Sequence, residues 1–347
     1  GNFGTITITI NATITDSSTS TTSNLSTTCS CVVDLNNTLA NINIAVNTST
    51  SDAATITDTG SITATDLNTL DAKVGGLTAS GIGTITGNYS DVNTAVSNVT
   101  VSGSVAVTIA DTTTASNLNT LAGSVGNITL STSTVSSSSN SDLVSLSGNG
   151  LQNATSVNVT VSDASLTPSN LNTLDTSYGT VNASATVTLS SDTFANINTY
   201  LNAGGITKPT NKAITCSDAI TVANGNTLAS AVGTSTLALS TGLSDTLTAL
   251  GSISNITAKV SDVAITVDNT TGTLAASDLS TLGGKTTGTV TTSNGIAVSG
   301  TESEVTAALV TSSTKVTLGA TTNVTVTDEV TAAEGGAIAN TTNATGI

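Results

Sequence analysis

One phrase recurs along this chain at a nearly constant spacing, and a fixed period constrains the fold more than any single local motif does. The copies lie at Asp66–Leu70, Asn117–Leu121, Asn170–Leu174, Asn224–Leu228 and Asp278–Leu282. Their last leucines are separated by 51, 53, 54 and 54 residues. A related phrase lies between them, at Ser90–Ala95, Phe194–Thr199 and Ser303–Ala308. The chain is therefore predicted to contain two alternating kinds of half-repeat, each of ~26 residues.

Short alternating runs of β-branched residues precede these phrases, as in Val105–Ile109, Val157–Val161 and Val324–Val326. Alternation with a period of two is typical of a strand that buries one face. Within the phrase the spacing changes, because Leu67, Leu70 and Val74 fall on one stripe of a two-turn helix. We therefore expect a strand, a turn, a short helix and a returning segment in each half-repeat.

Helix start signals agree with this interpretation. Thr167 precedes Pro168, and Thr301 with Glu304 fits a capping box. Aligned copies place further N-cap threonines at Thr63, Thr114 and Thr331. The helices are predicted to begin directly after these residues.

No half-repeat has enough Val, Ile and Leu to bury an apolar face alone, so neighbours must stack. The sequence predicts an elongated parallel β-solenoid with a short helix or helical turn in each ~26-residue half-repeat. A string of β-sandwich domains is disfavoured, because aromatic residues are 1% of the chain and the 2 prolines form no linker. We divide the chain into an N-terminal strand with a divergent first repeat (1–55), which is a cap or a subunit contact, tandem repeats of ~53 residues (56–330) and a truncated half-repeat (331–347).

The composition limits the function. Charged residues are 8% of the chain, its net charge is −16, and it has no His. Six basic residues cannot form the cationic surface of a nucleic-acid-binding protein. Serine catalysis lacks its usual base, and the acidic residues follow the repeat instead of departing from it, so we expect no enzyme. No apolar run is long enough for membrane insertion. Because the chain has no Met, even at position 1, we expect an exported protein from which an N-terminal segment was removed.

Aspartates recur where the strand of one half-repeat ends, at Asp58, Asp111, Asp163, Asp218 and Asp328. The interpretation we favour is that these carboxylates cap backbone amides as the strand gives way to the turn. Half-repeats of the other kind carry Gly87, Ser191 or Gly300 there, so we expect the carboxylates to lie roughly 10 Å apart. Calcium binding by the same five aspartates is the alternative, although no EF-hand loop or glycine-aspartate nonapeptide is present. Apart from calcium, no cofactor is expected.

The three cysteines are an odd number for an exported chain. Cys29 and Cys31 could close a local disulfide or cross-link subunits. Cys216 follows Ile214 and Thr215 at a core-facing strand position, so we expect a small buried apolar side chain.

Three phrases carry a resemblance to a known group of proteins. They are Leu67–Asp71 (Leu-Asn-Thr-Leu-Asp), Ser90–Ala95 (Ser-Asp-Val-Asn-Thr-Ala) and Gly-Thr-Val at 179–181 and 288–290. With them the region from about 56 to 330 resembles the Thr/Ser/Asn/Ala-rich tandem repeats of large exported surface proteins of cyanobacteria and other aquatic bacteria. This resemblance implies repetitive extracellular scaffolding and carries over no catalytic residue.

Neither predicted end of the solenoid has the charged outer face that would cap its core. We therefore expect a structural subunit of an extracellular filament, fibre or surface layer (S-layer) at the cell surface, which assembles head to tail with itself. The N-terminal strand, Thr5, Ile6, Thr7, Ile8, Thr9 and Ile10, is predicted to add to a neighbour's sheet. The alternatives are an adhesive or glycan-binding stalk module of a larger surface protein, with glycans or a cell surface as partners, and a phage fibre component.

Overall fold

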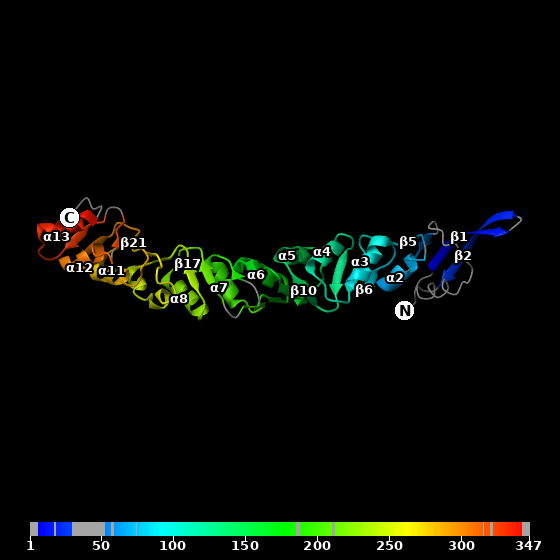
Figure 1. Cartoon of the computed structure of the whole chain (residues 1–347), viewed down its shortest axis with the longest axis horizontal. Helices are drawn as coiled ribbons and strands as arrows, with labels where there is room; N and C mark the ends of the chain where they lie inside the picture. Colours follow the sequence, from blue (N-terminus) through cyan, green and yellow to red (C-terminus); the bar gives the residue numbers. More distant parts are fainter. Residues whose placement is uncertain are drawn as a thin grey trace. The chain divides into compact units, whose positions relative to one another are not determined.

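The computed structural model describes residues 6–16, 19–29, 53–56, 59–73, 75–184, 188–209, 212–314, 316–319 and 322–341, with side chains from Thr55 onward. Short strands and short helices alternate throughout this part of the chain (Figure 1). The chain divides into two compact units that interleave along the sequence. Unit 1 comprises residues 1–163, 173–183 and 205–207, and unit 2 comprises 164–172, 184–204 and 208–347.

Unit 1 contains three open sheets, in the orders β2-β1-β3-β5-β7, β4-β6-β8-β9 and β10-β11-β13-β15. Apart from the pairings of β1, these strands pair in parallel. Their bounds are β1 Ile6–Asp16, β2 Thr19–Cys29, β3 Ala53–Thr55, β4 Ser61–Thr63, β5 Gly76–Ala79, β6 Thr84–Gly87, β7 Thr100–Val101, β8 Ala106–Ile109, β9 Asn127–Leu130, β10 Thr134–Ser138, β11 Asn158–Val161, β13 Thr180–Asn182 and β15 Ile206–Thr207.

Unit 2 contains four parallel sheets, in the orders β12-β14, β16-β17, β18-β19-β21-β23 and β20-β22-β24. Their strands are β12 Ser165–Leu166, β14 Thr188–Leu189, β16 Ile214–Cys216, β17 Leu237–Leu239, β18 Leu243–Asp245, β19 Ile265–Val267, β20 Thr273–Ala275, β21 Val290–Thr292, β22 Ala297–Gly300, β23 Val316–Thr317 and β24 Val324–Val326.

Helices separate the strands along the sequence. They are α2 Ala64–Asp71, α3 Tyr89–Asn98, α4 Ala115–Ala122, α5 Asn140–Gly148, η1 Ala154–Ser156, α6 Pro168–Ser177, α7 Phe194–Asn202, α8 Val222–Ala231, α9 Leu247–Leu250, α10 Ser254–Thr257, α11 Ala276–Gly283, α12 Glu302–Leu309 and α13 Ala332–Thr341. We call a helix, together with the strands directly before and after it, a coil. In the described part of the chain no helix has the length and apolar character needed to cross a membrane.

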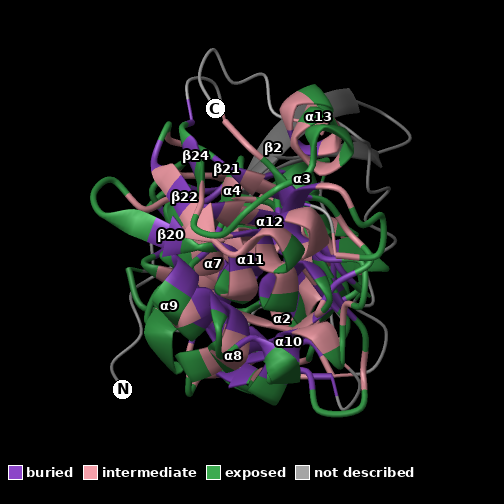
Figure 2. Cartoon of the chain, turned by 90° about the vertical axis from the view of Figure 1, so that its left-hand side faces the viewer, coloured by how far each residue is buried: buried purple, intermediate pink, exposed green. Residues whose placement is uncertain are grey.

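Strand pairing stacks apolar side chains of successive coils in register. Ile62 pairs with Ile85 and Ile85 with Val107, and all three side chains are buried. The helices add leucines to the same core, as Leu67 and Leu70 do in α2. Figure 2 shows buried residues beside exposed ones in β20 and beside intermediate ones in β22. The core is therefore a series of layers, one contributed by each coil.

The predicted combination of parallel strands and short helices is present, and the alternating runs at Val105–Ile109, Val157–Val161 and Val324–Val326 lie on β8, β11 and β24. The sequence prediction lacks one strand in each coil. The returning segment after the helix is itself a strand, such as β5, β13 or β21. The signal for two of these strands is the Gly-Thr-Val phrase at 179–181 and 288–290. A Cβ at Gly179 would lie 2.9 Å from the Thr155 carbonyl oxygen, and one at Gly288 would lie 2.2 Å from that of Asp262. Only glycine allows backbones of successive coils to approach this closely.

Candidate assembly site

The start of most helices is held by a hydroxyl from the same coil, whereas α3, α10 and α11 have no side-chain hydrogen bond at the N-cap. In α2 the Thr63 side chain accepts the N–H of Asp66 at 3.1 Å, and in α13 that of Thr331 accepts the N–H of Glu334 at 3.3 Å. The same contact is made by Thr114, Ser139, Thr167, Thr193, Thr221, Thr246 and Thr301. Thr301 and Glu304 complete a capping box. The N-caps predicted at Thr63, Thr114, Thr167, Thr301 and Thr331 are therefore confirmed.

At several helix starts, a carboxylate from the following coil accepts a second backbone N–H. Tyr89 N–H donates to Asp111 Oδ1 at 2.7 Å, and Asn140 N–H donates to Asp163 Oδ2 at 2.6 Å. In unit 2 the Phe194 and Glu302 amides donate to Asp218 and Asp328 at 2.8 and 2.6 Å. We call these groups carboxylate caps. Four of the five predicted aspartates thus satisfy helix amides, but each one caps the helix of the preceding coil and so ties two coils together.

The alternate half-repeats were predicted to carry glycine or serine, and so no carboxylate, at the position of the aspartate. This prediction was wrong at several positions. Asp192 Oδ2 accepts the N–H of Ser169 at 2.8 Å, and Asp245 Oδ2 accepts that of Val222 at 3.1 Å. Ser138 Oγ and Asn269 Oδ1 cap Ala115 and Leu247 in the same way. Asp192 follows β14 and Asp245 is the last residue of β18, so the expected spacing of one carboxylate for every two coils does not hold in unit 2.

At two other helix starts the corresponding position is a glycine that packs against the first alanine of the helix. A Cβ at Gly87 would lie 3.1 Å from the Ala64 Cβ, and one at Gly300 would lie 2.9 Å from that of Ala276. Ala64 and Ala276 are the first residues of α2 and α11 and are fully buried. The predicted Gly87 and Gly300 positions therefore have a packing role.

Two carboxylate caps have perturbed pKa values. Burial raises the pKa of Asp192, but hydrogen bonds from Asn196, Ser169 and Thr193 outweigh this effect and hold the pKa below its ordinary value. Burial likewise acts against ionisation of Asp218, and hydrogen bonds from Cys216 and Phe194 lower its pKa overall. The negative charge of Asp192 opposes the ionisation of Asp218. Both groups therefore favour the ionised form in the folded chain.

Cys216 confirms the prediction of a buried side chain on a strand, since it lies on β16 and is 0% exposed. Its Sγ donates to Asp218 Oδ1 at 3.0 Å. Burial, together with the neighbouring carboxylate, raises the pKa of the thiol to about 12. A thiol in this state is a weak nucleophile and a poor metal ligand.

Several predicted site residues lie outside the described residues, namely Thr5, Cys31, Asp58 and Val74. Ile6, Thr7, Ile8, Thr9 and Ile10 form the start of β1, and Cys29 is the last residue of β2. Within the part of the chain that is described, no three His, Cys, Asp or Glu side chains gather closely enough to hold a metal ion.

The N-terminal strand pairs within its own chain. β1 is antiparallel to β2 from Ile6 to Asp16, and Thr7 and Ile8 also pair with Thr55 and Ala54 of β3. β2 is the outermost strand of this sheet. β1 pairs with β3 only at Thr7 and Ile8, so among the described residues both the outer edge of β2 and the second edge of β1 from Thr9 to Asp16 have no partner strand.

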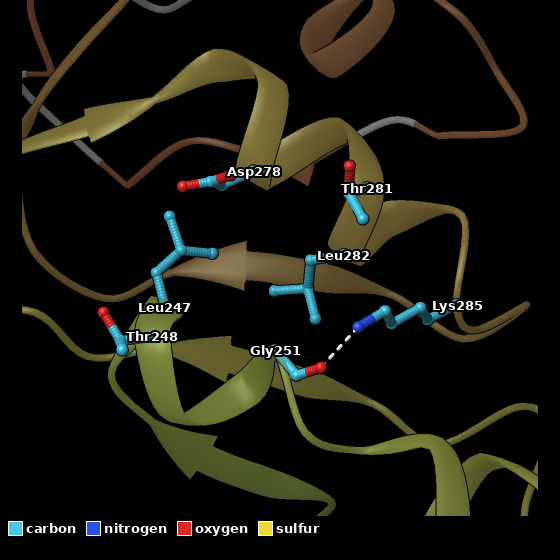
Figure 3. A pocket seen from close by; sticks show the side chains of 7 residues that line it. All are labelled: Leu247, Thr248, Gly251, Asp278, Thr281, Leu282 and Lys285. Carbon is cyan, nitrogen blue, oxygen red and sulfur yellow. Dashed lines mark hydrogen bonds between the residues drawn. The ribbon is translucent and has the colours of Figure 1, made fainter.

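A hollow of about 240 Å³ lies between α9 and α11 in unit 2. Figure 3 shows Leu247 and Leu282 facing it, with Asp278 and Thr248 at one side and Lys285 at the other. Lys285 Nζ donates to the Gly251 carbonyl oxygen at 2.5 Å. The hollow exists because α9 stops after one turn, at Leu250, where most of the other helices continue for eight to ten residues.

A second hollow, of about 270 Å³, lies on the coil that contains β24 and α13, which we call the last coil. Its lining includes Val324, Val326, Val330, Gly335 and Ile338. Figure 2 shows α13 mostly in the colours of intermediate and exposed residues, and Ile338 is its buried residue. Val330 is 44% exposed, and the only other large apolar side chain that is exposed among the described residues is Val144, at 41%.

Comparisons with protein-family models, with curated proteins and with solved structures give no match for this chain.

Proposed function

We propose that this protein is a structural subunit that assembles with itself into an extracellular filament, fibre or surface layer. The observation that carries the proposal is the repetition of one coil-to-coil contact, in which strands pair in register and a carboxylate caps the helix of the preceding coil. Such a contact can be repeated by any further coil of the same kind. The last coil presents the corresponding surface with Val330 exposed.

We further propose that the parallel sheets and their helices form a β-solenoid. Three features support this arrangement: the strands of successive coils pair in parallel, their residues stay in register, and the apolar side chains form layers. Each coil buries its apolar residues only against its neighbours, as in other repeat proteins. A solenoid of this kind joins other copies through its terminal coils.

The composition favours scaffolding over chemistry. The chain has no His, and the carboxylates that recur in it satisfy helix amides. The resemblance to tandem repeats of exported bacterial surface proteins points in the same direction, as does the repeated use of small polar residues on exposed positions. We propose that the protein acts outside the cell, at its surface.

Light scattering of the purified chain over a wide concentration range tests the proposal. We expect the average mass to rise with concentration, and we expect deletion of residues 1–29, which removes the whole β1–β2 hairpin, to reduce that rise strongly. A chain that stays monomeric at every concentration, with or without the hairpin, would contradict self-assembly.

The second candidate is an adhesive or glycan-binding stalk module. The hollow between α9 and α11 favours it, because hydroxyl, carboxylate and ammonium groups line its rim over an apolar floor of Leu247 and Leu282. Its volume of about 240 Å³ is below the roughly 300 Å³ at which ligand pockets usually begin. Specific binding of the monomer on a glycan array would favour this candidate. A phage fibre component would share the assembly behaviour, so the source of the filaments decides between that case and a cellular fibre.

A further inference from the structure

One helix position decides how each coil packs. The fourth residue after the N-cap points into the core, where it faces the residue that precedes the N-cap. This position is a fully buried leucine in α2, α4, α6 and α11, namely Leu67, Leu118, Leu171 and Leu279. It is glycine in α8 and in α13, at Gly225 and Gly335.

In α8 the space left by the glycine is filled by another coil. A Cβ at Gly225 would lie 2.6 Å from Ile256 Cδ1 and 3.1 Å from Leu243 Cδ2. Ile256 belongs to α10 of the following coil and is 0% exposed. An isoleucine of one coil thus inserts into the space at the glycine of the coil before it.

In α13 the same space is open. Among the described residues, a Cβ at Gly335 would have one neighbour within 4 Å, the Val330 Cγ2 at 3.8 Å. Val330 precedes the N-cap Thr331, and the residues at its position in the coils of α2, α4, α6, α8 and α11 are at most 9% exposed, compared with 44% for Val330. Those residues are Ile62, Thr113, Leu166, Ile220 and Leu274. Ala332, the first residue of α13, is also exposed, whereas its counterparts Ala64, Ala115 and Ala276 are fully buried.

We propose that the hollow at Gly335 is a docking site for a second copy of this chain, which inserts an aliphatic side chain as Ile256 does at Gly225. This inference rests on the proposed self-assembly and assigns one of its two surfaces. The contacts between other coils indicate the occupant. Elsewhere in the chain, the equivalent residues are covered by another coil that is rich in Val, Ile and Leu. The outermost position of β24 in its sheet allows the incoming strand to extend the same sheet.

Replacing Gly335 by Leu tests the proposal without weakening the chain. The new side chain fills the hollow from within, as Leu67 does in α2, and it favours the helix. We expect the Gly335→Leu variant to keep or raise the thermal midpoint and to lower the self-association constant at least tenfold in sedimentation velocity. The matched control is Gly336→Leu, because Gly336 is the next residue of the same helix, is exposed, and has open space around it. The control should assemble as the unchanged chain does.

A second pair of variants tests the rim of the hollow. Val330→Asp places a charge at the docking surface, and Val144→Asp places the same charge at the equally exposed position on α5. We expect loss of assembly for Val330→Asp alone.

The outcomes separate this inference from the proposed function. If the unchanged chain assembles and Gly335→Leu assembles equally well, the docking site is wrong while self-assembly stands. If both glycine variants lose assembly to the same extent, the hollow is not the specific contact and the inference also falls. If the unchanged chain does not assemble, both proposals are wrong.

Discussion

At the residue scale, the carboxylate that follows a strand does more than end the strand. Asp218 accepts the Phe194 N–H of the preceding helix and the Cys216 thiol of its own strand. The sequence identified this aspartate by its recurrence, but it could not show which amide the carboxylate reaches. That partner lies 24 residues earlier, and only the pairing of successive coils brings the two groups together.

We expect Asp218→Ala to lower the free energy of unfolding by about 1–2 kcal/mol, because a helix amide loses its cap and the buried thiol loses its acceptor. Urea denaturation followed by circular dichroism measures the change. The control is Asp262→Ala, which changes an exposed aspartate in the same unit. Equal effects of the two substitutions would show that the cap contributes nothing.

The lowered pKa values of Asp192 and Asp218 predict a loss of stability in acid. A group whose pKa is lower in the folded chain binds fewer protons there, so its contribution is complete above the unfolded pKa of about 3.9 and disappears as the pH falls through the folded pKa. The urea midpoint should therefore be nearly constant from pH 7 to pH 5 and should fall below about pH 4. The double variant Asp192→Asn, Asp218→Asn should show a shallower fall, and an unchanged slope would refute the assignment.

At the element scale, the sequence predicted one strand and one helix per coil, and the helices begin where the capping residues indicated. The alternation of β-branched and polar residues is a local signal, so β8, β11 and β24 could be recognised. The returning strands β13 (Thr-Val-Asn) and β21 (Val-Thr-Thr) each contain a single apolar residue, so their own residues do not show the apolar alternation. The position of these strands depends on how closely the neighbouring coil approaches. That distance is a feature of the tertiary structure and has no local signal in the sequence.

Gly288→Ala should therefore destabilise the protein by about 1–3 kcal/mol, because the new methyl group would overlap the carbonyl oxygens of Asp262 and Val263. Gly103→Ala is the comparison, since a Cβ there has nothing within 4 Å. That substitution should be neutral or stabilise the chain by up to about 1 kcal/mol through the unfolded state. Thermal unfolding of both variants distinguishes the two effects, and a neutral Gly288→Ala would contradict the close approach of these coils.

At the scale of the whole molecule, the repeat in the sequence predicted that neighbouring coils pack on one another, but it did not indicate which apolar side chains stay exposed. The phrase Asp-Leu-Asn-Thr-Leu of α2 corresponds to Glu-Gly-Gly-Ala-Ile in α13. In the sequence, the change from Leu67 to Gly335 indicates only that the repeat is less regular there. The structure shows its consequence, which is a hollow beside an exposed valine. The addition of the N-terminal strand to a neighbour stays a prediction, because β1 pairs with β2 along its length but with β3 only at Thr7 and Ile8.

Negative-stain electron microscopy of the purified protein alone, at increasing concentration, tests whether copies of this chain join through their coils. We expect filaments or ordered sheets whose subunits repeat at a constant spacing, and we expect Gly336→Leu to form them while Gly335→Leu does not. Separate particles of a single chain at every concentration would contradict this expectation.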